Sequence, residues 1–188
     1  MNIWIDVEVA EQIPFIKSLS DELKQRGHFV TITACDSEEI KSKLNEYVLQ
    51  VKIIGKKNTF FGLFNEQSDL IRFTSLADYI EKRKINIAFS LGSKPMVVTC
   101  NNLNLSIALF LESPRDNVDW LHYSLEKSYF IVQHTITEQQ IIKQNINPKK
   151  VARIDHTVSL KETTISTRAI KDIANKIEMF SSFKDIKA

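Results

Sequence analysis

The chain has 188 residues, of which 43% are hydrophobic and 26% charged, and its formal net charge is +2 at pH 7. These values are typical of one globular domain, and they exclude a disordered or collagen-like chain. The near-neutral charge gives no electrostatic case for nucleic acid or for a membrane surface.

Strand-like and helix-like segments alternate along the chain. Strands are expected at Ile3–Val9, Phe29–Ala34, Gln50–Ile54, Ile85–Leu91, Leu105–Leu111, Ser128–Gln133 and Val151–Ile154. Helices are expected at Ile13–Arg26, Glu38–Tyr47, Glu66–Lys84, Pro95–Leu103, Thr137–Asn145 and Ser166–Phe180. Lys56–Asn65 is expected to be a loop, and Arg115–Glu126 a loop or short helix.

This alternation predicts the fold class. Parallel neighbouring strands need crossover connections, so we expect a Rossmann-like, doubly wound parallel α/β sheet of about six to seven strands with helices on both faces. Residues 1–165 would form the domain, and a helix within residues 166–188 would pack back on it. In the longest helix, the apolar face predicted from spacing is Leu70, Phe73, Leu76, Ala77 and Ile80.

Segments that follow the strands are the candidate sites, because ligands of open α/β sheets bind beyond the carboxyl ends of the strands. Gly92-Ser93-Lys94 is the best candidate for an anion site, since a glycine admits a ligand to the backbone and the next helix offers free N–H groups. It matches neither GxGxxG nor a Walker A motif, so an ordinary strand-to-helix turn is the competing interpretation. Asp36 follows a neighbouring strand and is a second ligand-binding candidate.

Acidic residues follow the first strand. Asp6, Glu8 and Glu11 could perform acid–base chemistry if their environments separate their pKa values. The favoured interpretation is instead a solvated loop beside a helix N-terminus, because no nucleophile or basic partner is visible nearby in the sequence. Asp6 and Glu8, with Glu112 from a later loop, are the candidate catalytic residues.

Two further loops have two interpretations each. Glu112–Asp116 carries both charge signs, so Arg115 could bind a polar ligand or the segment could be a self-paired surface turn. Phe60, Phe61 and Phe64 could form an exposed interface, or their loop could fold back on the core.

Metal, cofactor and membrane chemistry have no support in the residue spacing. Cys35 and Cys100 form no CxxC motif, and the four histidines form no HxH or HxxxH pair, so we expect no metal site. The longest apolar runs are far shorter than a bilayer span, and no secretory signal is recognisable. A cytoplasmic protein without a membrane span is therefore expected.

Several short motifs resemble the start of the DUF354 family. They are Ile3-Trp4-Ile5-Asp6, Phe15, Leu23, Arg26-Gly27-His28, Thr31-Ile32-Thr33-Ala34 with Asp36, Ile54-Gly55, Ser90 to Ser93, and Arg153 with the stretch to Leu160. That family is similar to UDP-N-acetylglucosamine 2-epimerases and GT-B glycosyltransferases. The resemblance implies the N-terminal domain of a GT-B fold, with a UDP-sugar as the ligand to consider.

The sequence departs from the family in length and in its loops. It is about half the family length, so we expect only the N-terminal half. Where the family has an Asn-Pro-Pro-His-type turn, this chain has Val9-Ala10-Glu11-Gln12, and Gln12 cannot titrate. The family's Thr-Ala-Arg-Asp becomes Thr33-Ala34-Cys35-Asp36, which loses a cation that could pair with phosphate. Together these changes argue against catalysis of the family type.

Three functions follow as hypotheses. The first is a non-catalytic half that acts through a partner or as a homodimer. The second is the acceptor-binding subunit of a split glycosyltransferase or epimerase, completed by a separately encoded half. The third is a nucleotide- or sugar-binding module that uses Gly92, Ser93 and the loop near Asp36.

Overall fold

The computed structural model describes residues 1–56, 59–60, 63–64, 66–113, 127–160 and 165–183. Its main strands are β1 (Asn2–Val7), β2 (Phe29–Asp36), β3 (Lys52–Lys56), β6 (Ile87–Ser90), β7 (Ile107–Leu111), β8 (Ser128–Gln133) and β9 (Val151–Ile154). Its α-helices are α1 (Ile13–Gln25), α2 (Glu38–Glu46), α3 (Glu66–Glu81), α4 (Lys94–Asn102), α5 (Glu138–Lys143) and α6 (Thr167–Ser182). The short 3₁₀ helices η1 (Ala10–Gln12) and η3 (Pro148–Lys150) precede α1 and β9.

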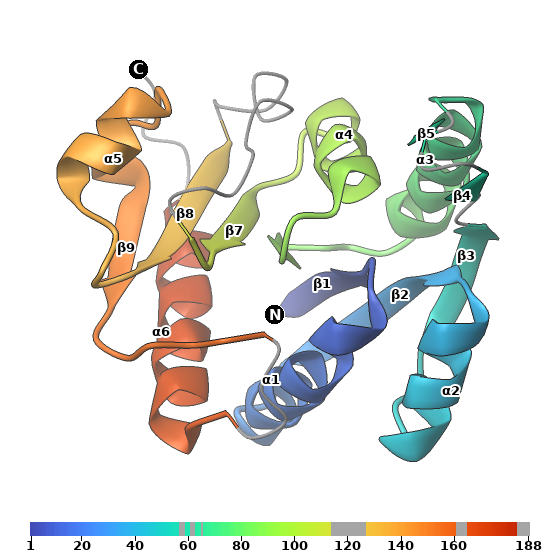
Figure 1. The fold of residues 1–188 in the computed structure, drawn as a ribbon, viewed down its shortest axis with the longest axis horizontal. Helices are drawn as coiled ribbons and strands as arrows, with labels where there is room; N and C mark the ends of the chain where they lie inside the picture. Colours follow the sequence, from blue (N-terminus) through green and yellow to red (C-terminus); the bar gives the residue numbers. More distant parts are fainter. Residues whose placement is uncertain (57–58, 61–62, 65, 114–126, 161–164, 184–188) are drawn as a thin grey trace.

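The main strands form one seven-stranded sheet in the order β3-β2-β1-β6-β7-β8-β9 (Figure 1). Every neighbouring pair in it is parallel. Successive strands run outward from β1 on one side and then outward from β6 on the other, which is the doubly wound arrangement. The predicted fold class is therefore confirmed, and the order reverses between β1 and β6.

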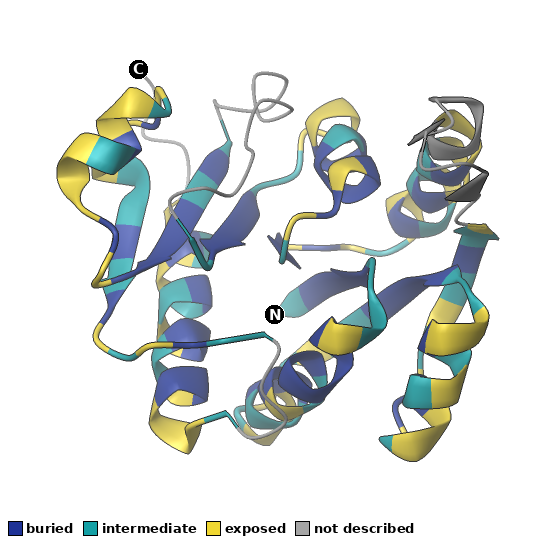
Figure 2. Cartoon of the chain, viewed as in Figure 1, coloured by how far each residue is buried: buried dark blue, intermediate teal, exposed yellow. Residues whose placement is uncertain are grey.

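Two hydrophobic clusters cover the two faces of this sheet. Alternation along β1 sends Ile3, Ile5 and Val7 to the face covered by α1, α2 and α6, whereas Trp4 belongs to the face covered by α3, α4 and α5. Both faces of the central strands are buried, as Figure 2 shows by the dark colour of β1, β6 and β7. This explains why β7 reads as a continuous apolar run, Ile107–Leu111.

Helix α6 packs against α1, with the apolar residues Ile170, Ile173, Ala174 and Ile177 buried. Polar contacts attach the C-terminal half of α6 to the turn that follows α1. The Arg26 guanidinium donates to Asn175 Oδ1 at 2.7 Å and to Glu178 Oε2 at 3.0 Å. His28 Nε2 lies 2.7 Å from Glu178 Oε1. The last helix is thus joined to the first helix and to the turn that leads into β2.

Two structural predictions were wrong. Part of the expected loop Lys56–Asn65 is an antiparallel pair of two-residue strands, β4 (Thr59–Phe60) and β5 (Leu63–Phe64), separate from the main sheet. The apolar face of α3 is also rotated from the prediction, since Leu70 is 62% exposed and Arg72 is buried. Tertiary charge pairing, described below, overrides hydrophobic spacing at that position.

Candidate functional site

The site begins with three polar side chains aligned across the centre of the sheet. In the parallel register, Asp6 of β1 lies opposite Thr33 of β2 and Ser90 of β6. Because side chains alternate between the faces of a strand, Asp6 shares a face with Trp4, under α3 and α4. This point lies at the carboxyl ends of the strands where the strand order reverses, which is where open α/β sheets bind ligands.

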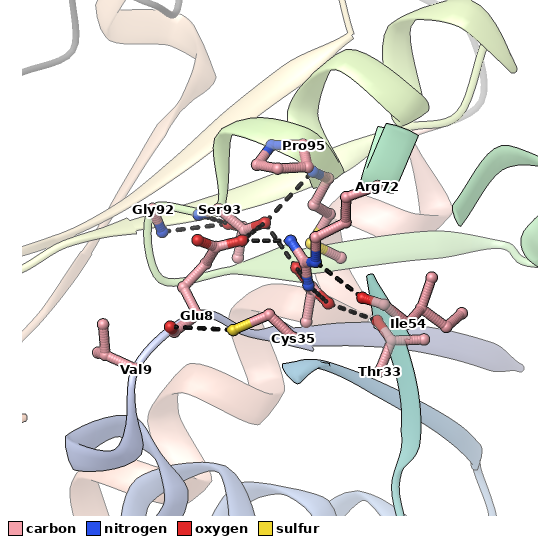
Figure 3. A network of polar contacts seen from close by, with 12 residues as sticks. Glu8, Val9, Thr33, Cys35, Ile54, Arg72, Gly92, Ser93 and Pro95 are labelled. Carbon is pink, nitrogen blue, oxygen red and sulfur yellow. Dashed lines mark hydrogen bonds and ion pairs between the residues drawn. The ribbon is translucent and has the colours of Figure 1, made fainter. Parts of the chain in front are cut away.

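Arg72 of α3 forms an ion pair with Asp6. Its Nη2 lies 2.8 Å from both Asp6 carboxylate oxygens, and its Nη1 pairs with Glu8 Oε1. Its Nε donates to the carbonyl oxygen of Ile54 at 3.1 Å. The guanidinium therefore joins α3 to the ends of β1 and β3, as the close view in Figure 3 shows.

Two hydroxyl groups supply the remaining hydrogen bonds to Asp6. Trp4 Nε1 donates to Thr33 Oγ1 at 2.9 Å, and the Thr33 hydroxyl donates to Asp6 Oδ1 at 2.5 Å. Ser93 Oγ lies 2.6 Å from Asp6 Oδ2 and 3.0 Å from Glu8 Oε1. A carboxylate offers about four acceptor positions. Asp6, which is 1% exposed, uses them within the protein.

Gly55 makes room for this arginine. It has φ +72°, and an added Cβ would lie 2.7 Å from Arg72 Cγ and 2.8 Å from Arg72 Cβ. These atoms lie at the base of the side chain, so they cannot swing aside. The glycine near the carboxyl end of β3 thus leaves room for the arginine of the ion pair.

Two backbone N–H groups of the turn between β6 and α4 form hydrogen bonds within the turn. Ser90 Oγ accepts hydrogen bonds from the backbone N–H groups of Gly92 at 3.1 Å and Ser93 at 2.9 Å. Ser93 is the N-cap of α4, since its Oγ also accepts from Met96 N at 3.2 Å. Two of the amides that could cradle an anion, those of Gly92 and Ser93, are therefore engaged within the turn.

Gln12 ties the first loop to this turn. Its Oε1 accepts from the backbone N–H groups of Glu8 at 3.0 Å and Val9 at 3.4 Å, and its Nε2 donates to the Leu91 carbonyl at 3.2 Å. The residue is 6% exposed. Gln12, which has no ionisable group, thus forms a neutral cross-link between the two loops.

The electrostatics favour the charged form of Arg72. Burial alone would lower the pKa of Arg72, but the charges of Asp6 and Glu8 outweigh that cost and raise it. Burial also raises the pKa of the nearby Cys100 thiol, and the negative charge of Asp6 adds to the effect. A thiol with a raised pKa is a poor nucleophile at neutral pH, so Cys100 is a packing residue here.

Of the predicted site residues, the structure brings together Asp6, Glu8 and Ser93. Glu8 is the partly accessible member of the ion pair, with 24% of its side chain exposed. The interpretation of Asp6 as part of a solvated loop was wrong, because Arg72 is a basic partner and Asp6 is buried. Glu11 is exposed in η1, as a solvated residue would be.

Other predicted residues lie apart from this cluster. Gly92 and Lys94 are exposed at the turn, and Asp36 forms an ion pair of 2.6 Å with Lys41. Glu112 Oε1 accepts from the Leu160 backbone N–H at 3.2 Å. Arg115, Phe61 and the side chains of Phe60 and Phe64 lie outside the described residues, so those predictions stay predictions.

Sequence reasoning missed Arg72, although a signal was present. Arg72, Leu76 and Ile80 recur at intervals of four, so they share one helix face. Two acidic residues at the end of the first predicted strand needed a cation. Combining the helix face with that charge requirement would have identified the arginine.

No family model and no curated protein matches the chain. Solved structures do match its fold. They include UDP-GlcNAc 2-epimerase from Methanocaldococcus jannaschii, with TM-score 0.64 and 15% identity over 81% of this chain and 45% of that one. UDP-GlcNAc 2-epimerase from Neisseria meningitidis, bound to UDP-GlcNAc, matches with TM-score 0.60 and 11% identity over 80% and 46%. MurG from Acinetobacter baumannii matches with TM-score 0.58 and 10% identity over 81% and 44%.

These likenesses define the class of the domain by its fold. It is a Rossmann-like α/β domain of the kind expected for the N-terminal domain of a GT-B protein. The chain spans less than half the length of the solved structures that it matches. No helix among the described residues combines the length and apolar character that crossing a membrane requires.

Proposed function

We propose that the chain is an N-terminal-type half of a GT-B-like protein, non-catalytic by itself, that acts through a partner or as a homodimer. The observation that carries this proposal is the closed ion pair at the strand-order reversal. A general base must reach the proton that it removes. Asp6 already binds Arg72, Thr33 and Ser93, and it is buried.

The residues around the ion pair support the same conclusion. Gln12 cannot titrate and is used to join two loops. The Gly92 and Ser93 amides are bound by Ser90, which weakens the case for an anion cradle in this turn. A domain whose polar groups at the strand ends bind one another in this way offers a binding surface rather than a catalytic centre.

A second candidate is the acceptor-binding subunit of a split enzyme. The observation that favours it is coverage, because the chain matches only 45% and 46% of two structures with epimerase names. In that case Glu8 and Ser93 would face an acceptor only after a second half had joined the chain. The third hypothesis, a nucleotide- or sugar-binding module, has the weakest support, because the turn amides are engaged.

The test is to incubate the purified chain with UDP-GlcNAc and to follow both turnover and binding. We expect no release of UDP, no epimerised product and no saturable binding at millimolar ligand. Turnover by the chain alone would overturn the non-catalytic role. Saturable binding without turnover would instead favour the binding module.

A further inference from the structure

A groove of about 430 Å³ lies beside the edge strand β3. Four consecutive strand residues, Lys52–Gly55, line it together with Ser75, Asp78, Tyr79 and Lys82 of α3. Figure 1 shows β3 at the margin of the sheet, with α3 near its carboxyl end. Among the described strands, only β2 pairs with β3, so the opposite backbone edge of β3 has no strand beside it.

An unpaired strand edge exposes backbone donors and acceptors that an extended chain can bind. Beyond the lining residues, the same face of α3 continues to an exposed apolar side chain. Ile71, which is 65% exposed, lies four residues before Ser75, and Asp78 and Lys82 continue the same face at helical spacing. A bound strand would thus meet backbone groups on one side and a mixed helix face on the other.

The positive charge along the groove indicates what kind of segment could bind there. Lys52, Lys56 and Lys82 are exposed along the groove or at its end, against the single lining carboxylate of Asp78. Edge lysines discourage pairing with unselected strands because an approaching chain must neutralise them. The same lysines would attract a strand that carries carboxylates.

We propose that the β3–α3 groove binds an extended, acidic segment of a partner protein as an added strand. This inference rests on the proposed partner-dependent role and specifies a surface for it. A second copy of the chain fits the groove less well. Antiparallel pairing of two β3 strands would bring Lys52 of one copy toward Lys56 of the other, and like charges in opposed positions are destabilising.

The probe for this proposal is a labelled, end-capped seven-residue peptide that alternates glutamate and valine, followed by fluorescence polarisation at low salt. We expect saturable binding that weakens as salt is added, because the attraction involves exposed charges. The double variant Lys52→Glu/Lys82→Glu should weaken binding by at least about tenfold, which corresponds to about 1.4 kcal/mol. N-methylation of alternate peptide amides should abolish binding, since it removes backbone donors.

The matched control is Lys143→Glu/Lys149→Glu, which makes the same charge change at exposed lysines of α5 and η3. It should bind the peptide within about twofold of wild type, allowing for a small long-range effect. Absence of saturable binding, equal weakening by both double variants, or equal binding of a lysine–valine peptide would overturn the proposal. Circular dichroism checks that each variant is folded.

The failure of this inference can be separated from the failure of the proposed function. Wild type and both double variants are tagged and purified gently from the native host. If wild type and Lys52→Glu/Lys82→Glu retain the same stoichiometric partner, the groove proposal is wrong and the partner-dependent role stands. If wild type assembles with neither a partner nor itself, the proposed function is wrong.

Discussion

Asp6 carries its charge at a position that water does not reach, between three strands and beneath α3. The cost of burying a carboxylate is offset here by one guanidinium and two hydroxyl groups. Glu8 shares the guanidinium at the edge of the cluster. Two carboxylates, Asp6 of β1 and Glu8 just after it, thereby depend on a single arginine of α3, and this dependence can be measured.

Replacing Arg72 with methionine keeps much of its volume but leaves Asp6 buried and unpaired. We expect the free energy of unfolding to fall by about 3–5 kcal/mol, the usual consequence of removing one partner of a buried ion pair. Urea unfolding at pH 7, followed by circular dichroism, measures it. Arg168→Met, at an exposed position of α6, is the matched control and should change stability by less than about 0.5 kcal/mol.

The companion variant is Asp6→Val/Arg72→Met, which removes both charges. It should be more stable than Arg72→Met alone, because an uncompensated buried charge costs more than an apolar pair. If Arg72→Met lowers the free energy of unfolding by less than about 1 kcal/mol, the ion pair does not organise the carboxyl ends of the central strands.

Gly55 and Gly27 offer a matched pair for testing close packing around Arg72. Both have positive φ, +72° and +82°, but an added Cβ meets Arg72 at Gly55 and nothing within 4 Å at Gly27. Alanine at either position should cost about 1–2 kcal/mol for the left-handed backbone. Gly55→Ala should cost at least about 1 kcal/mol more because it also displaces Arg72. Equal losses in urea unfolding would show that Arg72 does not crowd this glycine.

At the scale of elements, the last helix is attached by charge as well as by apolar packing. Burial would raise the pKa of Glu178, but its hydrogen bond from His28 and the charge of Arg26 lower it from the usual 4.5. A carboxyl with a lowered folded-state pKa stabilises the fold above its unfolded-state pKa, and this contribution is lost as the pH falls through the folded-state value. The attachment of α6 should therefore weaken in acid.

The variant Glu178→Gln tests this dependence. Wild type should be more stable than the variant at pH 6–7, and the difference should shrink as the pH falls below about 4.5. Urea unfolding across this pH range gives the comparison. Glu81→Gln, exposed on α3, should show little difference from wild type at any pH. A constant gap between wild type and Glu178→Gln would contradict a titrating contact.

The order and type of the main elements could be predicted from hydrophobic periodicity, because parallel strands and amphipathic helices differ clearly in pattern. Ser128–Gln133 and Val151–Ile154 were predicted with the observed limits. The rotation of α3 could not be predicted from hydrophobic periodicity alone, because Arg72 takes a core position to meet charges on a strand 66 residues away. The site residues Asp6, Glu8 and Ser93 followed from the strand-end rule, but their mutual neutralisation required the tertiary arrangement.

At the scale of the whole molecule, the chain combines a seven-stranded doubly wound sheet with a match to less than half of each structural neighbour. The carboxyl edge of the central strands is closed by internal contacts. The margin beside β3 carries an open strand edge and exposed lysines. These features together favour a domain that works in an assembly.

The proposed function requires that this chain acts as part of a complex. It is tested most directly by purifying the tagged chain gently from its native host and determining the mass and composition of the intact assembly by native mass spectrometry. We expect a defined assembly, either with a stoichiometric partner protein or with a second copy of the chain. Recovery of the chain as a monomer, with nothing bound across the concentrations tested, would contradict it.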